Sequence, residues 1–283
     1  MGVRVRVASG GLTDIGRVRS NNEDCFQIVA PLKLFVLADG MGGEAHGEIA
    51  AAMAVDAVVR HCQDMEANPA ARVIGPTQPD WSAWTKRLST AVHLANRCVF
   101  RSAEEHPEQH GMGATLTAAW INGAKLSIAH VGDSRAYLLR GGSLLQLTRD
   151  HSLVAEQVRR GILTTAEAEE SSMQSVLLRA LGAQAEIEVD AEEHALFPRD
   201  VLVLCSDGLT RMVTEPEIAG TLQAESNPDK AAEKLIALAN ERGGPDNITV
   251  VVVRVEKDSK GWFSWLRRGP RKLSNGNGSS GGK

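Results

Sequence analysis

The stretch Phe35-Val36-Leu37-Ala38-Asp39-Gly40-Met41-Gly42-Gly43 is an apolar, strand-like run that ends in one carboxylate and a group of glycines. Helix-like sequence follows it from Glu44 to about His61. A carboxylate at the end of a buried strand is costly to ionise unless it is paired, hydrogen-bonded or bound to a metal ion. The glycines permit a sharp turn and leave the Gly40 carbonyl open to a ligand. We therefore expect Asp39 to belong to a functional site.

Two other interpretations of this stretch are weaker. Asp-Gly is a common hairpin signal, but a hairpin needs a second strand directly after the turn, and the sequence from Glu44 to Met53 is helix-like. The spacing Gly40-x-Gly42-x-x-Ala45 fits a loose dinucleotide-binding pattern. That pattern needs a βαβ unit, whereas the next helix runs into the Pro- and Gly-bearing stretch from Pro69 to Pro79.

Composition narrows the class of protein. The 283 residues are enough for one large domain or two small ones, and a net charge of -4 gives no electrostatic reason to expect nucleic-acid binding. No apolar run approaches the roughly 18 residues of a membrane span. The four cysteines form no Cys-x-x-Cys pair, and the N-terminus has no apolar signal-peptide core. We expect a cytoplasmic protein.

Hydrophobic periodicity predicts an antiparallel β protein with helices. Strands are expected at Arg4 to Ala8, Cys25 to Ala30, Leu32 to Ala38, Ala114 to Ile121, Lys125 to Val131, Arg135 to Arg140, Ser143 to Leu147, Ala185 to Val189, Asp200 to Cys205 and Ile248 to Val255. Helices are expected at Glu44 to His61, Trp81 to Glu105, Glu215 to Gln223 and Pro228 to Arg242. Asn122-Gly123 is typical of a type I′ hairpin turn.

Two segments stand apart from this pattern. Residues 149–181 read as short helices, one of them opened by a capping sequence at Thr164, and form either a lid or a connector. Residues 257–283 read as a disordered tail in which Trp262 to Arg268 joins aromatic and basic side chains. This tail either docks a partner or a membrane surface, or is a linker remnant without a role.

Acidic residues recur where apolar strands end or begin. A single one of them is more often a turn or cap residue, and the polar loop that ends in Glu23-Asp24 could be a solvated charge cluster. Four such aspartates are too many for that explanation: Asp39, Asp133, Asp207 and Asp246. If the sheets bring them together, they repel unless divalent cations lie among them, and oxygen ligands without clustered His or Cys favour Mg²⁺ or Mn²⁺.

Six motifs follow one another in a familiar order. They are Arg19-x-x-Asn22-Glu23-Asp24, Asp39-Gly40-Met41-Gly42-Gly43, Gly113-Ala114-Thr115, Val131-Gly132-Asp133-Ser134-Arg135, Ser206-Asp207-Gly208 and Gly244-Pro245-Asp246-Asn247. From about Val5 to Val255 the chain resembles the metal-dependent protein serine/threonine phosphatases of the 2C type, and most of all their bacterial single-domain branch.

The resemblance implies an α+β fold, a four-layer α-β-β-α sandwich of two antiparallel sheets with a metal cleft at one edge. It implies a catalytic domain over residues 1–256, with 149–181 as a flap, and a tail over 257–283. It also implies ligands for two Mn²⁺ or Mg²⁺ ions: Asp39 would bridge them, Asp207 and Asp246 would complete the first site, the Gly40 carbonyl would serve the second, and Glu23 and Asp24 would bind directly or through water. Asp133, with Asp207, would hold a looser third ion.

The activity that the resemblance implies is hydrolysis of phosphoserine and phosphothreonine by a hydroxide that bridges the two ions. Arg19 would grip the phosphate, since its planar fork suits two phosphate oxygens. The partners would be phosphoproteins, including a Ser/Thr kinase that the enzyme opposes, and the chain would be a monomer. The alternatives are an inactive phosphatase-like docking module and a hydrolase of small phosphate esters.

The chain departs from the family at two places. Many eukaryotic relatives carry a histidine directly after Asp-Gly, where this chain has Met41, so a metal-bound water or His46 must protonate the leaving group. In the flap, bacterial relatives often have a His-Pro-x-Arg-Asn-like stretch, where this chain has Ser172-Met173-Gln174-Ser175.

Overall fold

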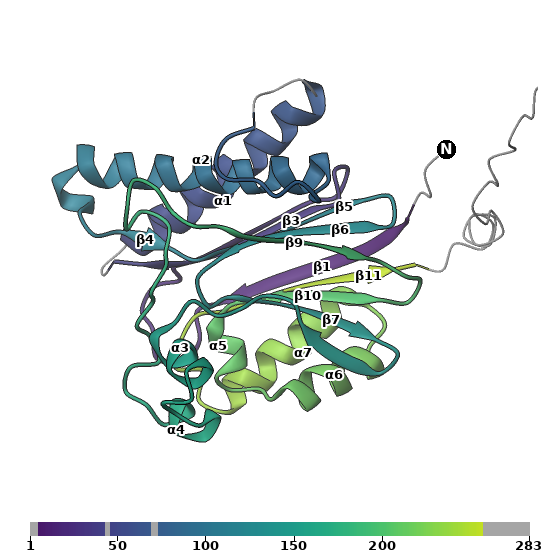
Figure 1. Ribbon diagram of the computed structural model, residues 1–283. Coiled ribbons are helices and arrows are strands. Elements are labelled where there is room, and N and C mark those ends of the chain that lie inside the picture. Colours follow the sequence, from purple (N-terminus) through teal and green to yellow (C-terminus); the bar gives the residue numbers. More distant parts are fainter. Residues whose placement is uncertain (1–4, 43–45, 69–72, 257–283) are drawn as a thin grey trace, which may run out of the picture.

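The computed structural model describes residues 5–42, 46–68 and 73–256. These residues form two antiparallel β-sheets stacked face to face, with helices on both outer faces (Figure 1). The expected four-layer α-β-β-α sandwich is confirmed. The expected start of the first strand at Arg4, the start of the first helix at Glu44 and the tail from 257 to 283 lie outside the described residues.

Each sheet joins strands from distant parts of the chain. The first sheet has the order β1 (Val7–Asp14), β11 (Ile248–Val255), β10 (Val201–Cys205), β7 (Arg135–Arg140) and β8 (Ser143–Gln146). The second has the order β2 (Asp24–Val29), β3 (Leu34–Met41), β5 (Leu116–Asn122), β6 (Lys125–Val131) and β9 (Asp190–Ala195), and the short β4 (Gly113–Ala114) pairs with the end of β3. Gly123 has a φ of +58°, as the predicted hairpin turn requires.

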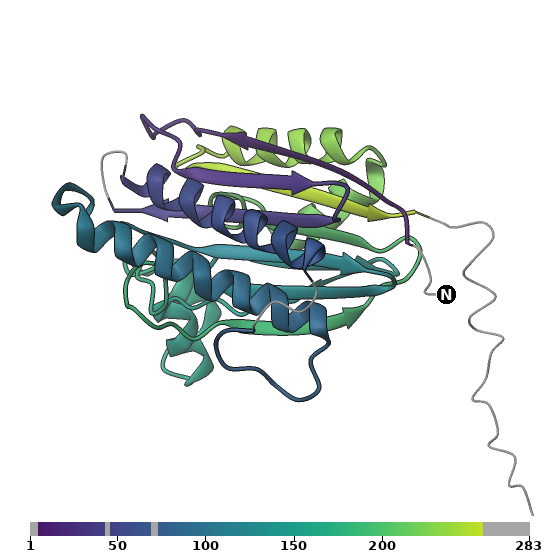
Figure 2. The same cartoon turned by 90° about the horizontal axis from the view of Figure 1, so that it is seen from above.

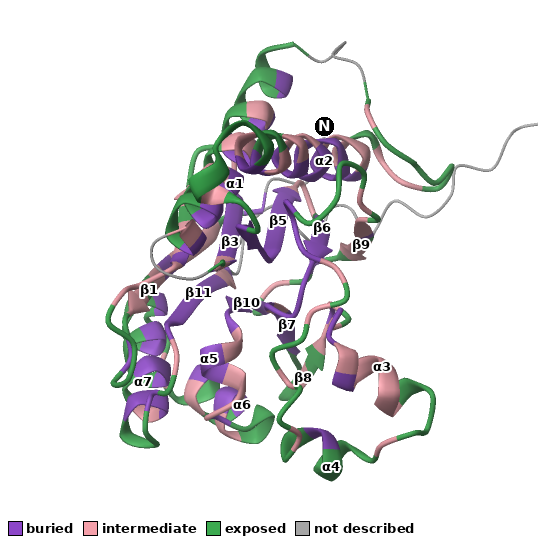
Figure 3. Cartoon of the chain, turned by 90° about the vertical axis from the view of Figure 1, so that its left-hand side faces the viewer, coloured by how far each residue is buried: buried purple, intermediate pink, exposed green. Residues whose placement is uncertain are grey.

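The helices cover the outer face of each sheet. The helices α1 (His46–Ala67) and α2 (Ala83–Glu105) run side by side over the second sheet (Figure 2), and the short η1 (Pro107–Gln109) follows α2. On the first sheet lie α5 (Asp207–Thr210), α6 (Glu215–Ala224) and α7 (Pro228–Glu241). Two short helices, α3 (Leu153–Arg159) and α4 (Thr165–Glu169), stand apart at one end and are largely exposed or half-buried (Figure 3). Thr164 caps α4 through the predicted capping box.

The strand β3 shows how the layers position the site. Leu34, Val36 and Ala38 pack in the core below α1 and α2, whereas Phe35 and Leu37 pack in the core between the two sheets. Because side chains alternate along a strand, Asp39 continues the series of Phe35 and Leu37. The same alternation that buries both faces of β3 therefore directs Asp39 into the space between the sheets.

Several predicted boundaries were wrong, among them the end of the first helix, which continues past His61 to Ala67. β1 continues through its glycines to Asp14. The glycines are needed there because α7 packs closely on the strand: a Cβ at Gly10 would lie 2.1 Å from an Asp229 carboxylate oxygen. β3 continues past Asp39 to Met41, because β4 supplies a further pairing partner. Residues 185–189 form no strand: the Asn96 side chain of α2 donates hydrogen bonds to the carbonyls of residues 184 and 185, and β9 begins only at residue 190.

Candidate metal centre

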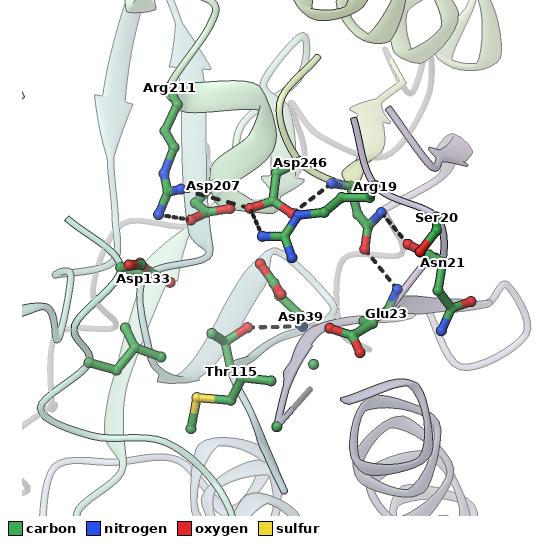
Figure 4. Close-up of a pocket in the computed structure, with 16 residues that line it drawn as sticks. Arg19, Ser20, Asn21, Glu23, Asp39, Thr115, Asp133, Asp207, Arg211 and Asp246 are labelled. Carbon is green, nitrogen blue, oxygen red and sulfur yellow. Dashed lines mark hydrogen bonds and ion pairs between the residues drawn. The ribbon is translucent and has the colours of Figure 1, made fainter. Parts of the chain in front are cut away.

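The predicted acidic residues converge on one cleft of about 340 Å³. The cleft lies where the ends of the two sheets meet (Figure 4). Every predicted site residue except Asp24 lines it: Arg19, Glu23, Asp39, Gly40, Asp133, Asp207 and Asp246. The residues come from both sheets and the loops between them, so the sandwich itself brings these distant carboxylates together.

Thr115, the residue directly after β4, holds the backbone of Asp39. The backbone N–H of Asp39 donates to Thr115 Oγ1 at 3.0 Å, and the carbonyl of Asp39 accepts from the Thr115 N–H at 2.8 Å. Burial raises the pKa of Asp39 well above its usual range, and the charges of Asp24, Asp207, Asp133 and Asp246 add to the rise. An ionised Asp39 therefore needs a cation close by.

Asp24 lies behind the cleft as the cross-strand neighbour of Asp39. Its Oδ2 accepts hydrogen bonds from Thr249 Oγ1 at 2.6 Å and from Ser206 Oγ at 2.8 Å. Its Oδ1 is buried and has no hydrogen-bond partner. Burial raises the pKa of Asp24 to about 7 against these two hydrogen bonds. One oxygen is thus fixed by the first sheet, and the other is left for a further ligand.

Two arginines neutralise the other side of the cluster. Arg19 Nη2 lies 2.9 Å from Asp246 Oδ2, and Arg211 Nη2 lies 2.5 Å from Asp207 Oδ2. Asp207 Oδ1 is buried and has no hydrogen-bond partner. Burial and the charge of Asp246 raise the pKa of Asp207, although Arg211 opposes that rise.

Asp133 lies at the flap side of the cleft. It follows Gly132, whose φ of +109° and close approach to Thr115 would strain any other residue. Burial raises the pKa of Asp133 to about 7, and the charge of Asp207 adds to the rise. Asp133 and Asp207 are therefore electrostatically linked, as a shared cation would require.

Gly40 is where the backbone of β3 approaches α1. A Cβ at Gly40 would lie 2.0 Å from the Gly47 carbonyl oxygen, so any side chain there would displace the helix start. A Cβ at Gly47 would in turn lie 2.9 Å from a carboxylate oxygen of Glu23. These two glycines let the strand, the helix and Glu23 meet at the cleft.

The donor set fits hard divalent cations. The cleft offers carboxylate and carbonyl oxygens, and the buried oxygens of Asp24 and Asp207 without partners are orphans that a cation would satisfy. Within the described residues, no three acidic, histidine or cysteine side chains are already oriented on one point. Asp207 and Asp246 do not point at a common centre, because they pair with Arg211 and Arg19.

Asn247 also lines the cleft, although no role was predicted for it. Its Nδ2 donates to the carbonyls of Ile15 at 3.0 Å and Asn21 at 2.9 Å, and its Oδ1 accepts from the Glu23 N–H at 2.8 Å. One amide thus ties the loop that carries Arg19 to the strand start that carries Asp246. Its position directly after Asp246 in the last motif was the available signal.

Further support comes from residues that sequence reasoning also passed over. Thr115, Ser206 and Thr249 hold Asp39 and Asp24, and their positions beside the motifs carry only a weak signal. Arg211 gives a clearer one, since it follows Asp207 by four residues, a spacing at which helical side chains meet.

Residues 149–181, the expected flap, reach the cleft and are anchored at both ends. Ser175 and Leu177 line the cleft. Near the start of the flap, the buried His151 accepts a hydrogen bond from the Gly132 N–H at Nδ1, and its Nε2 lies 3.2 Å from Asp190. Near the end of the flap, Arg179 pairs with the same Asp190 at 2.7 Å.

The two candidates for a leaving-group acid differ in position. Met41 lines the cleft but has no proton to give. His46, at the start of α1, is not among the described residues that line the cleft. The structure therefore gives no support to His46 as the acid.

An exposed arginine beside clustered acidic oxygens, at the edge of a two-sheet sandwich, is the arrangement of a metal-dependent phosphatase. Residues 17–239 match the family described as Protein phosphatase 2C. The chain belongs to this family.

Similar proteins come from several bacteria. The serine/threonine phosphatase stp of Listeria welshimeri is 38% identical over 252 residues, which are 88% of this chain and 96% of the relative. The serine/threonine protein phosphatase PstP of Mycobacterium tuberculosis is 38% identical over 243 residues, which are 86% of this chain and 44% of the relative.

Solved structures of serine/threonine phosphatases are also similar to this chain. A crystal structure of the M. tuberculosis serine/threonine phosphatase PstP/Ppp matches with a TM-score of 0.78 at 36% identity, covering 90% of this chain and 100% of the other. The PstP catalytic domain in complex with two manganese ions matches with a TM-score of 0.75 at 36% identity, with the same coverage.

Proposed function

We propose that this chain removes phosphate from phosphoserine and phosphothreonine in proteins, with two Mn²⁺ or Mg²⁺ ions in the cleft. The observation that carries the proposal is the convergence of Asp39, Asp207 and Asp246 from both sheets, with a buried Asp207 oxygen that has no partner. The ions, when bound, supply Lewis acidity and a water activated for attack at neutral pH. The relatives' names favour this function over an inactive docking module.

Different residues of the cleft would bind each of the two ions. Asp39 would bridge them, because it lies between Asp207 and Asp246 on one side and Glu23 on the other (Figure 4). The Gly40 carbonyl and Glu23 would serve the second ion. Asp24 would reach the second ion through water, since it lies behind the cleft with one oxygen fixed.

Arg19 would bind the substrate phosphate. Its side chain is half exposed at the cleft and uses one guanidinium nitrogen for Asp246. The remaining donors can receive two phosphate oxygens, and they would neutralise charge that grows in the transition state. Since Met41 has no proton to give, water would protonate the leaving alkoxide.

A polypeptide substrate fits the flap better than a small ester does. Ser175 and Leu177 line the cleft, and Met173, Val176 and Leu178 of the same segment are exposed apolar side chains. Such a surface beside the cleft suits the side chains that flank a phosphorylated residue. Residues 149–181 would thus act as the flap of a catalytic domain that spans residues 1–256.

The remaining proposals concern the setting of the enzyme. Its partners would be phosphoproteins, among them a Ser/Thr kinase that it opposes, and it would act as a monomer. Among the described helices, none has the length and apolar character needed to cross a bilayer. All four cysteines are free thiols, which supports action in a reducing cytoplasm. A docking role for the tail can be tested by deleting residues 261–283 and measuring partner and liposome binding.

The direct test is phosphate release from a phosphothreonine peptide with Mn²⁺, Mg²⁺ or EDTA, in the wild type and in Asp207→Asn. We expect release that depends on metal and falls at least a thousandfold in the variant. Asp56→Asn on the exposed side of α1 is the control. A folded wild type without release under any metal would promote the docking module. Faster turnover of para-nitrophenyl phosphate than of phosphopeptides would favour the small-ester hydrolase.

A further inference from the structure

Arg211 holds one particular oxygen of Asp207. It lies one turn after Asp207, and its backbone N–H donates to the Asp207 carbonyl at 2.9 Å. Its Nη2 lies 2.5 Å from Asp207 Oδ2, and its Nη1 lies 3.8 Å from Asp246 Oδ2. The other oxygen of Asp207 turns away from Arg211, toward Asp246 (Figure 4). Oδ1 thus faces the carboxylate cluster, and Oδ2 faces the guanidinium.

Asp133 lies near the same guanidinium. The carboxylate of Asp133 lines the cleft and is only 9% exposed. Arg211 lines the same cleft, and both side chains lie on the side of it away from Glu23 (Figure 4). A cation shared by Asp133 and Asp207 would need Asp207 Oδ2, because Oδ1 faces the other ligands. Arg211 is paired with Asp207 Oδ2, the oxygen that such a cation would need.

We propose that Arg211 is a built-in competitor for a third divalent cation, and that it makes the affinity of this chain for that ion lower than Asp133 and Asp207 alone would give. The inference rests on the proposed two-metal function and adds a limit to it. Arg211 would set how many ions the centre holds at a given metal concentration.

The two arginines of the cleft differ in how easily they give way. The Arg19 side chain is 50% exposed, whereas that of Arg211 is 25% exposed and begins from a helix turn that already carries Asp207. A guanidinium stays protonated throughout the working pH range, so this competition does not fade as pH rises. A divalent ion beside Arg211 must either displace it from Asp207 or tolerate its repulsion.

The test is a Mn²⁺ titration of the full chain after removal of metal with EDTA, followed by calorimetry and by the electron paramagnetic resonance signal of free Mn²⁺. In the wild type we expect two tight equivalents and a third that is at least tenfold weaker. In Arg211→Gln the third Kd should fall about tenfold, which corresponds to about 1.4 kcal/mol. Arg211→Lys keeps the charge and should resemble the wild type.

Two further variants make the result specific. Asp133→Asn in the Arg211→Gln background should remove the gained third equivalent. Arg60→Gln breaks a comparable Arg–Asp pair at i,i+4 on α1 and should leave the titration unchanged. Circular dichroism of each metal-free variant confirms that it is folded.

Three results would overturn the inference: an unchanged third Kd in Arg211→Gln, three equally tight ions in the wild type, or loss of the first two ions in Arg211→Gln. Failure of the proposed phosphatase function would look different. Phosphate release would then be absent at every Mn²⁺ concentration, while the ion counts stayed as predicted.

Discussion

Asp24 and Asp39 are direct cross-strand neighbours, paired in the antiparallel register of β2 and β3. Directly opposed residues point to the same face of a sheet, and like charges in this position destabilise it. Both side chains are directed into the space between the sheets, where the first sheet supplies Ser206 and Thr249 to one of them. The fold therefore keeps two carboxylates closer together than metal-free folding alone would favour.

This repulsion predicts a pH dependence of stability. Burial and neighbouring carboxylates raise the pKa of Asp24 and of Asp133 to about 7, whereas unfolded aspartate titrates near 3.9. The folded state therefore holds more protons between these values, and the metal-free protein should lose stability as pH rises from about 4 to about 7. Each shift of about three pKa units corresponds to about 4 kcal/mol, so we expect a loss of at least that order, or about 8–16 °C in Tm.

Thermal unfolding in EDTA and in Mn²⁺ between pH 5 and 8 checks this expectation. Because metal ions bind ionised carboxylates, the stabilisation by Mn²⁺ should increase over the same range. Asp24→Asn should flatten the slope in EDTA. A metal-free Tm that rises steadily from pH 5 to 7 would contradict the argument.

Substitution of glycine by alanine should have opposite effects on stability at Gly40 and at Gly220. A Cβ at Gly40 would lie 2.0 Å from the Gly47 carbonyl oxygen, whereas a Cβ at Gly220, on the exposed face of α6, has no neighbour within 4 Å. Gly40→Ala should destabilise the protein by several kcal/mol and weaken Mn²⁺ binding, since strand and helix must separate. Gly220→Ala should stabilise it by about 0.5–1 kcal/mol. Urea unfolding measures both, and equal effects would show that the close approach at Gly40 is unimportant.

Substitutions at Arg19 should separate the effect of its positive charge from the effect of its planar guanidinium. Arg19→Lys keeps the positive charge but loses the planar fork, so kcat/KM for a phosphopeptide should fall about tenfold. Arg19→Ala should cost about a hundredfold. Since Arg19 pairs with Asp246, neither variant should weaken Mn²⁺ binding. Steady-state kinetics at saturating Mn²⁺ and a parallel metal titration check both points, with Arg60→Lys as an exposed control.

The sequence predicted which acidic residues meet at the cleft better than it predicted their surroundings. Asp39, Asp133, Asp207 and Asp246 were recognisable because an acid at the end of an apolar strand breaks a local pattern. The partners Thr115, Ser206 and Thr249 break no such pattern, since a hydroxyl residue in or beside a strand is ordinary. Their roles depend on which strands lie opposite, and that pairing is set by the stacking of the two sheets.

The strand boundaries failed for a similar reason. Residues 185–189 have strand-like composition, but the side chain of Asn96, far away in sequence, holds the carbonyls of residues 184 and 185. Asp39 was expected at the end of its strand, yet β4 extends the pairing to Met41. In both places a long-range hydrogen-bond partner outweighed local propensity.

Asn247 and Asn96 form a matched pair that separates support of the site from support of the fold. Each is a buried asparagine whose Nδ2 donates to two backbone carbonyls and whose Oδ1 accepts one backbone N–H. Asn247 joins segments at the cleft, whereas Asn96 joins α2 to the segment that leads into β9. Replacement by alanine should therefore destabilise the protein by about 2–4 kcal/mol in both cases, because each change leaves buried backbone groups without partners.

Mn²⁺ binding should weaken in Asn247→Ala and stay nearly unchanged in Asn96→Ala. Asn247→Ala should weaken Mn²⁺ binding about 10- to 100-fold, since the amide fixes the backbone of Glu23 and directly follows Asp246. Asn96→Ala should leave Mn²⁺ affinity within a factor of two. Calorimetric titration at a temperature where both variants are folded makes the comparison. Equal losses of affinity would mean that the metal centre responds to overall stability, and that the hydrogen bonds of Asn247 have no specific role in it.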